Sequence, residues 1–166
     1  AAISQPGPGV INLSVGFGAE AAPLLRIAVD SAVAAGWLVV AVAGNSGGRG
    51  TVYPAALPHV LTVAASDRAG GVAPFSTRSR SVDLTAPGVG VLAAVPTWKD
   101  PSGFATLTGT SFAAPIVSGA AEPWCGLVPG GLNIGSSRAI PVSLVSRGGS
   151  RRADEVRPLG GPASGQ

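Results

Sequence analysis

Short apolar runs alternate with amphipathic segments over the first two thirds of the chain. Residues 10–15 (VINLSV), 38–43 (LVVAVA) and 60–65 (VLTVAA) are rich in β-branched or apolar residues and are bounded by turn-forming residues, so each predicts a strand. Shorter strands are predicted at 82–85 and 91–95. Continuously apolar runs are typical of strands that are covered on both faces of a parallel sheet.

Two further segments predict helices. Residues 24–35 carry apolar side chains at helical spacing, with Pro23 at the start and Gly36 after the end, as is usual at helix boundaries. Residues 110–121 are small and apolar throughout, as in a buried helix, and Pro123 is expected to end that helix at the preceding residue. This order of elements predicts an α/β fold of three layers, in which helices flank a mainly parallel sheet.

Composition divides the chain near residue 122. The 166 residues carry a net charge of +3, but residues 1–122 hold six basic and six acidic side chains. Residues 123–166 hold five arginines, two acids, nine glycines and five prolines. We therefore expect one globular domain over 1–122 and a poorly ordered tail over 123–166. Because the charge excess lies in this tail, without interleaved aromatic residues, it indicates no specific nucleic-acid partner.

Composition also argues against a membrane span, an internal disulfide and a cysteine-based metal site. The apolar run at 37–43 is too short to cross a bilayer, so no membrane span is predicted. Cys125 is the only cysteine, which excludes an internal disulfide, and no metal-finger spacing is found. No apolar leader with a basic start is found, so no signal peptide is expected within this chain.

Two segments carry candidate chemistry. In 109–115 (GTSFAAP), Ser111 opens the second predicted helix, where free backbone N–H groups and the helix dipole can hold a developing oxyanion. In 41–48 (AVAGNSGG), Asn45 follows a buried strand, at the edge where parallel α/β sheets bind ligands. Each segment alone also has an ordinary structural explanation, a helix N-cap for the first and a turn for the second.

Together and in this order, the segments resemble the subtilisin-like serine proteases, the subtilases. The resemblance is carried by 10–16 (VINLSVG), 39–45 (VVAVAGN), 52–54 (VYP), 60–65 (VLTVAA), 75–76 (FS), 82–88 (VDLTAPG) and 109–119 (GTSFAAPIVSG). It covers roughly residues 10–122 and corresponds to the C-terminal portion of the family's catalytic domain. It implies a subtilisin-like fold and a serine endopeptidase that acts on polypeptide substrates.

The resemblance also implies roles for individual residues. Ser111 matches the nucleophile that forms the acyl-enzyme. Asn45 matches the side-chain donor of the oxyanion hole, with the backbone N–H of Ser111 as the other donor. Ser14, Val15 and Gly16 match the strand edge that pairs with an extended peptide.

Substrate preference, cofactors and location are implied less directly. Ala43 and Gly44 match one wall of the pocket for the side chain before the scissile bond, which leads us to expect a medium or large apolar side chain. Val52 is expected to narrow the pocket floor. No cofactor is expected; calcium is common in the family, but we identify no acidic loop that would supply its ligands. Subtilases are commonly secreted or held at the cell surface, so an extracellular or cell-surface location is implied.

The Asp and the His of the family's catalytic triad have no match here. His59 is the only histidine, and it lies after Asn45 in a predicted loop, whereas Asp30, Asp67 and Asp83 fall in a helix, a turn and a structural motif. A serine hydroxyl without a base is a poor nucleophile. We therefore expect this chain to be a fragment that lacks the N-terminal half of the domain, inactive alone and poorly soluble because its sheet edge is exposed.

Two alternative functions and one hypothesis about the tail stay open. The first is a non-catalytic remnant that binds peptides at the strand edge without turnover. The second is a dinucleotide-binding domain, because 16–21 (GFGAEA) lies between a strand and a helix, although the next strand ends in Asn45 instead of the acid that would hold a ribose. A third hypothesis concerns the tail, which would result from a reading-frame change near residue 122.

Overall fold

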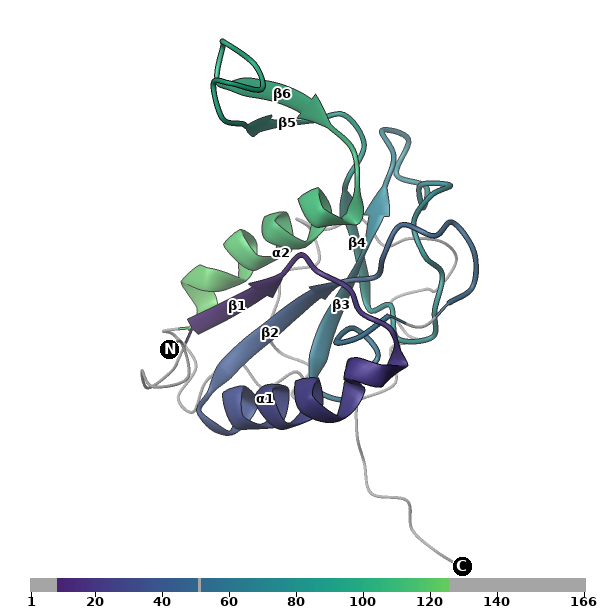
Figure 1. The fold of residues 1–166 in the computed structure, drawn as a ribbon, viewed down its shortest axis with the longest axis vertical. Coiled ribbons are helices and arrows are strands. Elements are labelled where there is room, and N and C mark those ends of the chain that lie inside the picture. The colour runs from purple at the N-terminus through teal and green to yellow at the C-terminus, as the bar shows by residue number, and fades with distance from the viewer. Residues whose placement is uncertain (1–8, 51, 126–166) are drawn as a thin grey trace, which may run out of the picture.

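The computed structural model describes residues 9–50 and 52–125 (Figure 1). Its elements are β1 (Gly9–Leu13), a 3-10 turn η2 (Ala19–Ala21), α1 (Ala22–Ala34), β2 (Trp37–Val42), β3 (Val60–Ser66), β4 (Leu84–Pro87), β5 (Val91–Ala94), β6 (Phe104–Leu107) and α2 (Thr110–Cys125). The predicted tail lies outside the described residues, apart from the backbone at the end of α2.

Four parallel strands form the central sheet, in the order β1-β2-β3-β4. Ile11 of β1 pairs with Val39 of β2, and Val63 of β3 pairs with Leu84 of β4. Among the described residues, β1 and β4 are therefore the edge strands of this sheet. The parallel arrangement confirms the interpretation of the continuously apolar runs.

The sheet is covered by one helix on each face (Figure 1). Alternate residues of β2 face opposite layers, because successive side chains of a strand point to opposite sides. Leu38, Val40 and Val42 of β2 belong to the core that includes Ala113, Ala114, Val117 and Ala121 of α2. Val39 and Ala41 belong to the core that includes Val29 and Ala32 of α1. The predicted α/β fold of three layers is thus confirmed.

Two predicted boundaries and one predicted helix face differ from the structure. The first strand ends at Leu13, two residues earlier than the apolar pattern suggested. The first helix runs from Ala22 to Ala34, and Leu24 and Ile27 on it are 76% and 66% exposed. The pattern counted both residues in the buried face, but the sheet covers only the stripe around Val29 and Ala32.

The second helix is longer than expected. Pro123 was predicted to end it, but α2 continues to Cys125. The φ angle of proline is compatible with a helix, and the cost lies in the missing N–H and the crowding of a carbonyl one turn earlier. That carbonyl belongs to Gly119, which is exposed, so water can replace the lost hydrogen bond.

An antiparallel hairpin of β5 and β6 projects from the three layers, at the top of Figure 1. Only its first strand was predicted from the sequence, and no partner was assigned to it. The hairpin leads directly into α2, with only Thr108 and Gly109 between Leu107 and Thr110. Within residues 9–50 and 52–125, no helix is both long and apolar enough to span a bilayer.

Candidate active site

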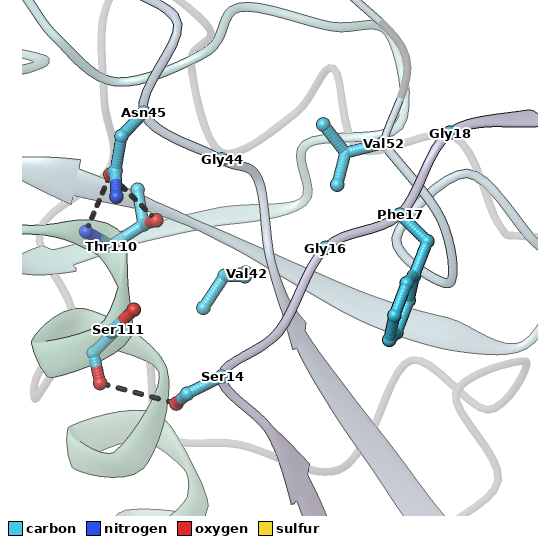
Figure 2. A pocket seen from close by; sticks show the side chains of 10 residues that line it. All are labelled: Ser14, Gly16, Phe17, Gly18, Val42, Gly44, Asn45, Val52, Thr110 and Ser111. Atoms are coloured by element: carbon cyan, nitrogen blue, oxygen red, sulfur yellow. Dashed lines mark hydrogen bonds between the residues drawn. The ribbon is translucent and has the colours of Figure 1, made fainter.

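A pocket of about 460 Å³ opens at the carboxyl ends of β1 and β2, beside the first turn of α2 (Figure 2). It is lined by Ser14, Gly16, Phe17, Gly18, Val42, Gly44, Asn45, Val52, Thr110 and Ser111. The pocket lies where polar loop residues follow buried parallel strands, which is the expected ligand-binding edge of such a sheet.

The amide of Asn45 is held by the residue before the candidate nucleophile. Its Oδ1 accepts hydrogen bonds from the backbone N–H and from the hydroxyl of Thr110, each at 2.9 Å. Thr110 is fully buried. Because these two donors occupy Oδ1, the remaining polar group of the amide is Nδ2, for which no hydrogen bond is found within residues 9–50 and 52–125. That nitrogen lies near Gly109, where a Cβ atom would approach it to 3.6 Å.

Ser111 lies one residue further along, in the first turn of α2, and is half-buried. The first N–H groups of a helix have no partner within the helix, so the Ser111 N–H points outward at the positive end of the helix dipole. In Figure 2 the side-chain oxygen of Ser111 points to the side of Asn45 and Thr110, while its carbonyl oxygen points to Ser14. An anion formed next to Ser111 would therefore meet backbone and amide donors.

The opposite wall of the pocket is the extended segment from Gly16 to Gly18, whose backbone orientation is fixed by a bridge to Tyr53. Phe17 and Tyr53 exchange two backbone hydrogen bonds of 2.9 and 3.0 Å in an antiparallel bridge. The polar groups of successive residues in an extended chain point to opposite sides. The N–H and C=O groups of Gly16 therefore point away from Tyr53, to the side on which a peptide could pair.

Two glycines bring this wall close to the loop after β2. A Cβ atom at Gly16 would lie 2.6 Å from Cγ1 of Val52, and one at Gly44 would lie 3.0 Å from Cγ2 of the same side chain. Gly44 also has a φ of 98°, which disfavours any other residue. Val52 thus fills the space between the two glycines and limits the depth of the pocket.

The pocket brings together six of the eight residues predicted from the sequence: Ser14, Gly16, Gly44, Asn45, Val52 and Ser111. Val15 and Ala43 do not line it. Val15 is 48% exposed beside the pocket, and Ala43 is buried, with its N–H bound to the carbonyl of Val63 at 2.9 Å. Both are neighbours of pocket residues along the chain, and alternation of side chains turns them away.

Four pocket residues were not predicted as part of this site: Phe17, Gly18, Val42 and Thr110. For Thr110, the only sequence signal was its place before a candidate nucleophile at a helix start. Phe17 and Gly18 were noted only within a glycine pattern. The contacts that place these residues join segments far apart in the chain, such as the 65 residues between Asn45 and Thr110.

His59 is exposed in the turn before β3, with a φ of 64°. It lies at the amino end of β3, whereas the pocket lies at the carboxyl ends of the strands, and a strand of this length spans about 20 Å. Asp30 pairs with Arg26 on α1 at 3.5 Å. Asp67 accepts two backbone N–H bonds within its own turn. None of these side chains lines the pocket.

Asp83 stands just before β4 and binds the first residues of β3. Its Oδ2 accepts the backbone N–H of Thr62 at 2.8 Å. Asp83 is exposed as a whole residue, but neighbouring protein atoms partly desolvate its carboxyl group, and this desolvation raises its pKa more than the hydrogen bond from the Thr62 N–H lowers it. Asp83 thus supports the sheet and does not line the pocket.

No group of three or more His, Cys, Asp or Glu side chains within residues 9–50 and 52–125 is arranged to hold a metal ion. The donors that line the pocket are hydroxyl, amide and backbone groups, which suit an oxyanion better than a cation.

A parallel sheet between two helices, with a serine at a helix start facing a held asparagine amide, defines an α/β protein with a candidate acyl-transfer site. The model of the subtilase family matches residues 1–122, and the chain belongs to this family. The resemblance described from the sequence motifs is thereby confirmed.

Individual relatives are longer than the region that matches this chain. The chain is 43% identical over 115 residues to subtilisin BL of Lederbergia lenta, which covers 69% of this chain and 41% of that protein. It is 40% identical over 116 residues to the major intracellular serine protease of Bacillus subtilis (strain 168), covering 67% of this chain and 35% of that protein. The chain thus spans less than half the length of these relatives.

A solved structure shows the same likeness. A cold adapted subtilisin-like serine proteinase superposes with a TM-score of 0.68 at 32% identity, over 80% of this chain and 46% of that chain. The described layers therefore belong to a subtilisin-like α/β fold.

Proposed function

We propose that this chain carries the nucleophile half of a serine endopeptidase site, with Ser111 as the nucleophile and Asn45 as the oxyanion donor. The observation that carries the proposal is the paired hydrogen bonding of Thr110 to Oδ1 of Asn45, which leaves Nδ2 as a free donor beside Ser111. Family membership supports the same chemistry.

In the proposed reaction, the Ser111 hydroxyl attacks the carbonyl carbon of a peptide bond and forms a tetrahedral intermediate. The negative oxygen of this intermediate accepts hydrogen bonds from Nδ2 of Asn45 and the N–H of Ser111. Collapse of the intermediate expels the amine and leaves an acyl group on Ser111, which water then hydrolyses.

The proton of the Ser111 hydroxyl needs an acceptor, and the residues that line the pocket supply no histidine or carboxylate. His59 lies at the other end of the sheet. We therefore propose that the base and its orienting acid belong to polypeptide outside this chain, and that the chain alone has little or no peptidase activity.

The proposed substrate is an extended polypeptide that pairs with Gly16. Its side chain before the scissile bond would enter the space between Gly16 and Gly44, where the methyl groups of Val52 limit the depth. We propose that this side chain is small, such as alanine or serine. This proposal replaces the medium or large side chain expected from the small pocket walls alone.

Two further proposals concern the extent of the domain and the location of the protein. We propose a domain over residues 1–122 followed by a separate tail, and a secreted or cell-surface protein. One relative is named as an intracellular protease, so a family likeness alone does not decide secretion. Fractionation of the natural host with an antibody against this domain would place the protein inside or outside the cell.

A fluorophosphonate probe that labels activated serines tests the assignment of Ser111. We expect the chain alone to react slowly and Ser111→Ala to abolish even that reaction. Adding a polypeptide that supplies the family's Asp and His motifs should accelerate labelling. Fast labelling of the chain alone would contradict the missing base, and equal labelling of Ser111→Ala would contradict the nucleophile.

A matched control separates the oxyanion donor from general damage. Asn45→Ala should slow labelling of the complemented protein by a factor on the order of 100 to 1,000. Ser31→Ala on α1 serves as this control, because the exposed Ser31 hydroxyl donates to the carbonyl of Ile27 within its own helix and does not line the pocket. An equal effect of both variants would contradict the assignment of Asn45.

A further inference from the structure

A line of side chains connects the edge strand β1 to helix α2. Oγ of Ser118 donates a hydrogen bond to Oδ1 of Asn12 at 3.0 Å, and Nδ2 of Asn12 donates to Oγ of Ser14 at 2.9 Å. Oγ of Ser14 in turn donates to the carbonyl oxygen of Ser111 at 3.2 Å. Asn12 thus uses both ends of its amide, one toward the helix and one toward the pocket.

The last bond of this line replaces a bond that the helix cannot make. In an α-helix the carbonyl of Ser111 would accept the N–H of the residue four positions later. That residue is Pro115, which has no N–H. The hydroxyl of Ser14 supplies the missing donor from another element, 97 residues away in sequence.

Asn12 determines the direction of the Ser14 hydroxyl. A serine hydroxyl has one proton to donate and lone pairs that accept. Because Asn12 donates to Oγ of Ser14, the proton of that hydroxyl is directed to the carbonyl of Ser111. A carboxylate at position 12 would only accept, and would draw the Ser14 proton toward itself.

From these contacts we infer that Asn12 is a positioning residue for Ser111: acting through Ser14, it supplies the hydrogen bond that Pro115 removes and so fixes the first turn of α2 against the wall that holds the peptide. The inference rests on the proposed function for its catalytic meaning. Ser14 also lines the pocket, so the same contact couples the place of the nucleophile to that of the peptide edge.

The Ser118 hydroxyl lies within hydrogen-bond distance of two acceptors, Oδ1 of Asn12 at 3.0 Å and the carbonyl of Ala114 at 3.1 Å. The Ser118 hydroxyl therefore helps to fix the orientation of the Asn12 amide. The hydrogen bond from Asn12 to Ser14 is the contact that affects the Ser111 carbonyl. Asn12 is exposed at its side chain, so its replacement leaves the buried core intact.

The carbonyl of Ser111 can be observed alone in the full chain. Residues 111 and 112 form the only Ser-Phe pair in the sequence, so ¹³C-carbonyl serine and ¹⁵N-phenylalanine labelling gives one cross-peak for this carbonyl. Loss of a hydrogen bond moves a carbonyl ¹³C resonance upfield. We expect this shift in Asn12→Asp and in Ser14→Ala, and no shift in the control Ser31→Ala.

The decisive variant is Asn12→Asp combined with Pro115→Ala. Alanine restores the N–H at position 115, so the helix itself can bind the Ser111 carbonyl and the resonance should return toward that of the unmodified chain. A purely structural role of Asn12 elsewhere would not be rescued at this position. An unchanged resonance in Asn12→Asp, or a shift that the second substitution fails to reverse, would overturn the inference.

Binding of a short alanine-rich peptide with an N-terminal fluorophore gives a second readout by fluorescence anisotropy. We expect Asn12→Asp to weaken binding by roughly two- to tenfold, the factor expected for one ordinary hydrogen bond, and Pro115→Ala to restore it. Unchanged affinity in Asn12→Asp would overturn the coupling to the peptide wall. If the unmodified chain binds no peptide while the resonances behave as expected, the proposed function fails and the role of Asn12 at the Ser111 carbonyl stands.

Discussion

Thr110 donates two hydrogen bonds to a single atom, Oδ1 of Asn45, from its backbone N–H and from its hydroxyl, each at 2.9 Å. One residue therefore orients the proposed oxyanion donor, Asn45, and immediately precedes the proposed nucleophile, Ser111. The buried side chain of Thr110 thus ties the amide of Asn45 to the start of the helix that carries Ser111.

Thr110→Val tests this contact, because valine keeps the shape of threonine and the backbone N–H but loses the hydroxyl. We expect the free energy of unfolding in urea to fall by about 0.5–1.5 kcal/mol. In an Asn45→Ala background the same substitution should cost less, because its partner is already gone. Equal costs in the two backgrounds would show that Thr110 acts on stability independently of Asn45.

Leu38→Ala tests the core between the sheet and α2. Leu38 is 2% exposed, so its truncation should lower the free energy of unfolding by about 2–5 kcal/mol. The matched control is Leu24→Ala on α1, where the side chain is 76% exposed and the change should stay within about 0.5 kcal/mol. Chemical denaturation of both variants checks the pair, and similar losses would contradict the described layers.

Gly16→Ala tests the close approach at the pocket floor. The added Cβ would lie 2.6 Å from Cγ1 of Val52, and such overpacking costs about 1–3 kcal/mol. Shortening the opposing side chain by Val52→Ala should relieve the clash in the double variant. Thermal unfolding of the three variants measures this, and a double variant no more stable than Gly16→Ala would place the strain elsewhere.

Asp83→Asn tests the effect of partial desolvation on the pKa of the Asp83 carboxyl. The raised pKa means that the folded state binds the proton more tightly than the unfolded state, so the charged form costs stability at neutral pH. Asparagine keeps an acceptor for the N–H of Thr62 and removes that cost. The variant should therefore be more stable than the parent at neutral pH.

This advantage of Asp83→Asn should shrink as the pH falls through the raised pKa of the folded state and vanish only well below the ordinary carboxyl pKa of 3.8, where Asp83 is protonated in both states. Thermal midpoints of both proteins across this range check the sign. An advantage that grows on acidification would mean that Asp83 is stabilised as the anion.

Much of the fold could be predicted from local patterns. The run at 38–43 is apolar at every position and the run at 60–65 is apolar except for Thr62, as is typical of strands covered on both faces, and both lie in the centre of the sheet. The strand at Phe104–Leu107 was missed because its short FATL pattern is not distinguishable from a loop. This segment forms a strand because it pairs with β5, and its own composition gives no such signal.

The candidate site was predictable in part. Ser111 and Asn45 stand in motifs that occur together in one family, and the structure places both in one pocket. Thr110 and Asn12 were not identified, because their roles come from hydrogen bonds to residues 65 and 106 positions away. No local pattern encodes contacts over such separations.

The amino-acid sequence by itself determined the layers, the family and the two residues of the proposed oxyanion chemistry, because hydrophobic periodicity and short motifs are local properties of the chain. Only the tertiary structure decided the exposure of Leu24 and Ile27, the depth of the pocket at Val52 and the line from Asn12 to Ser111. These features depend on which segments pack against one another, and packing places side chains that are distant in sequence within contact distance.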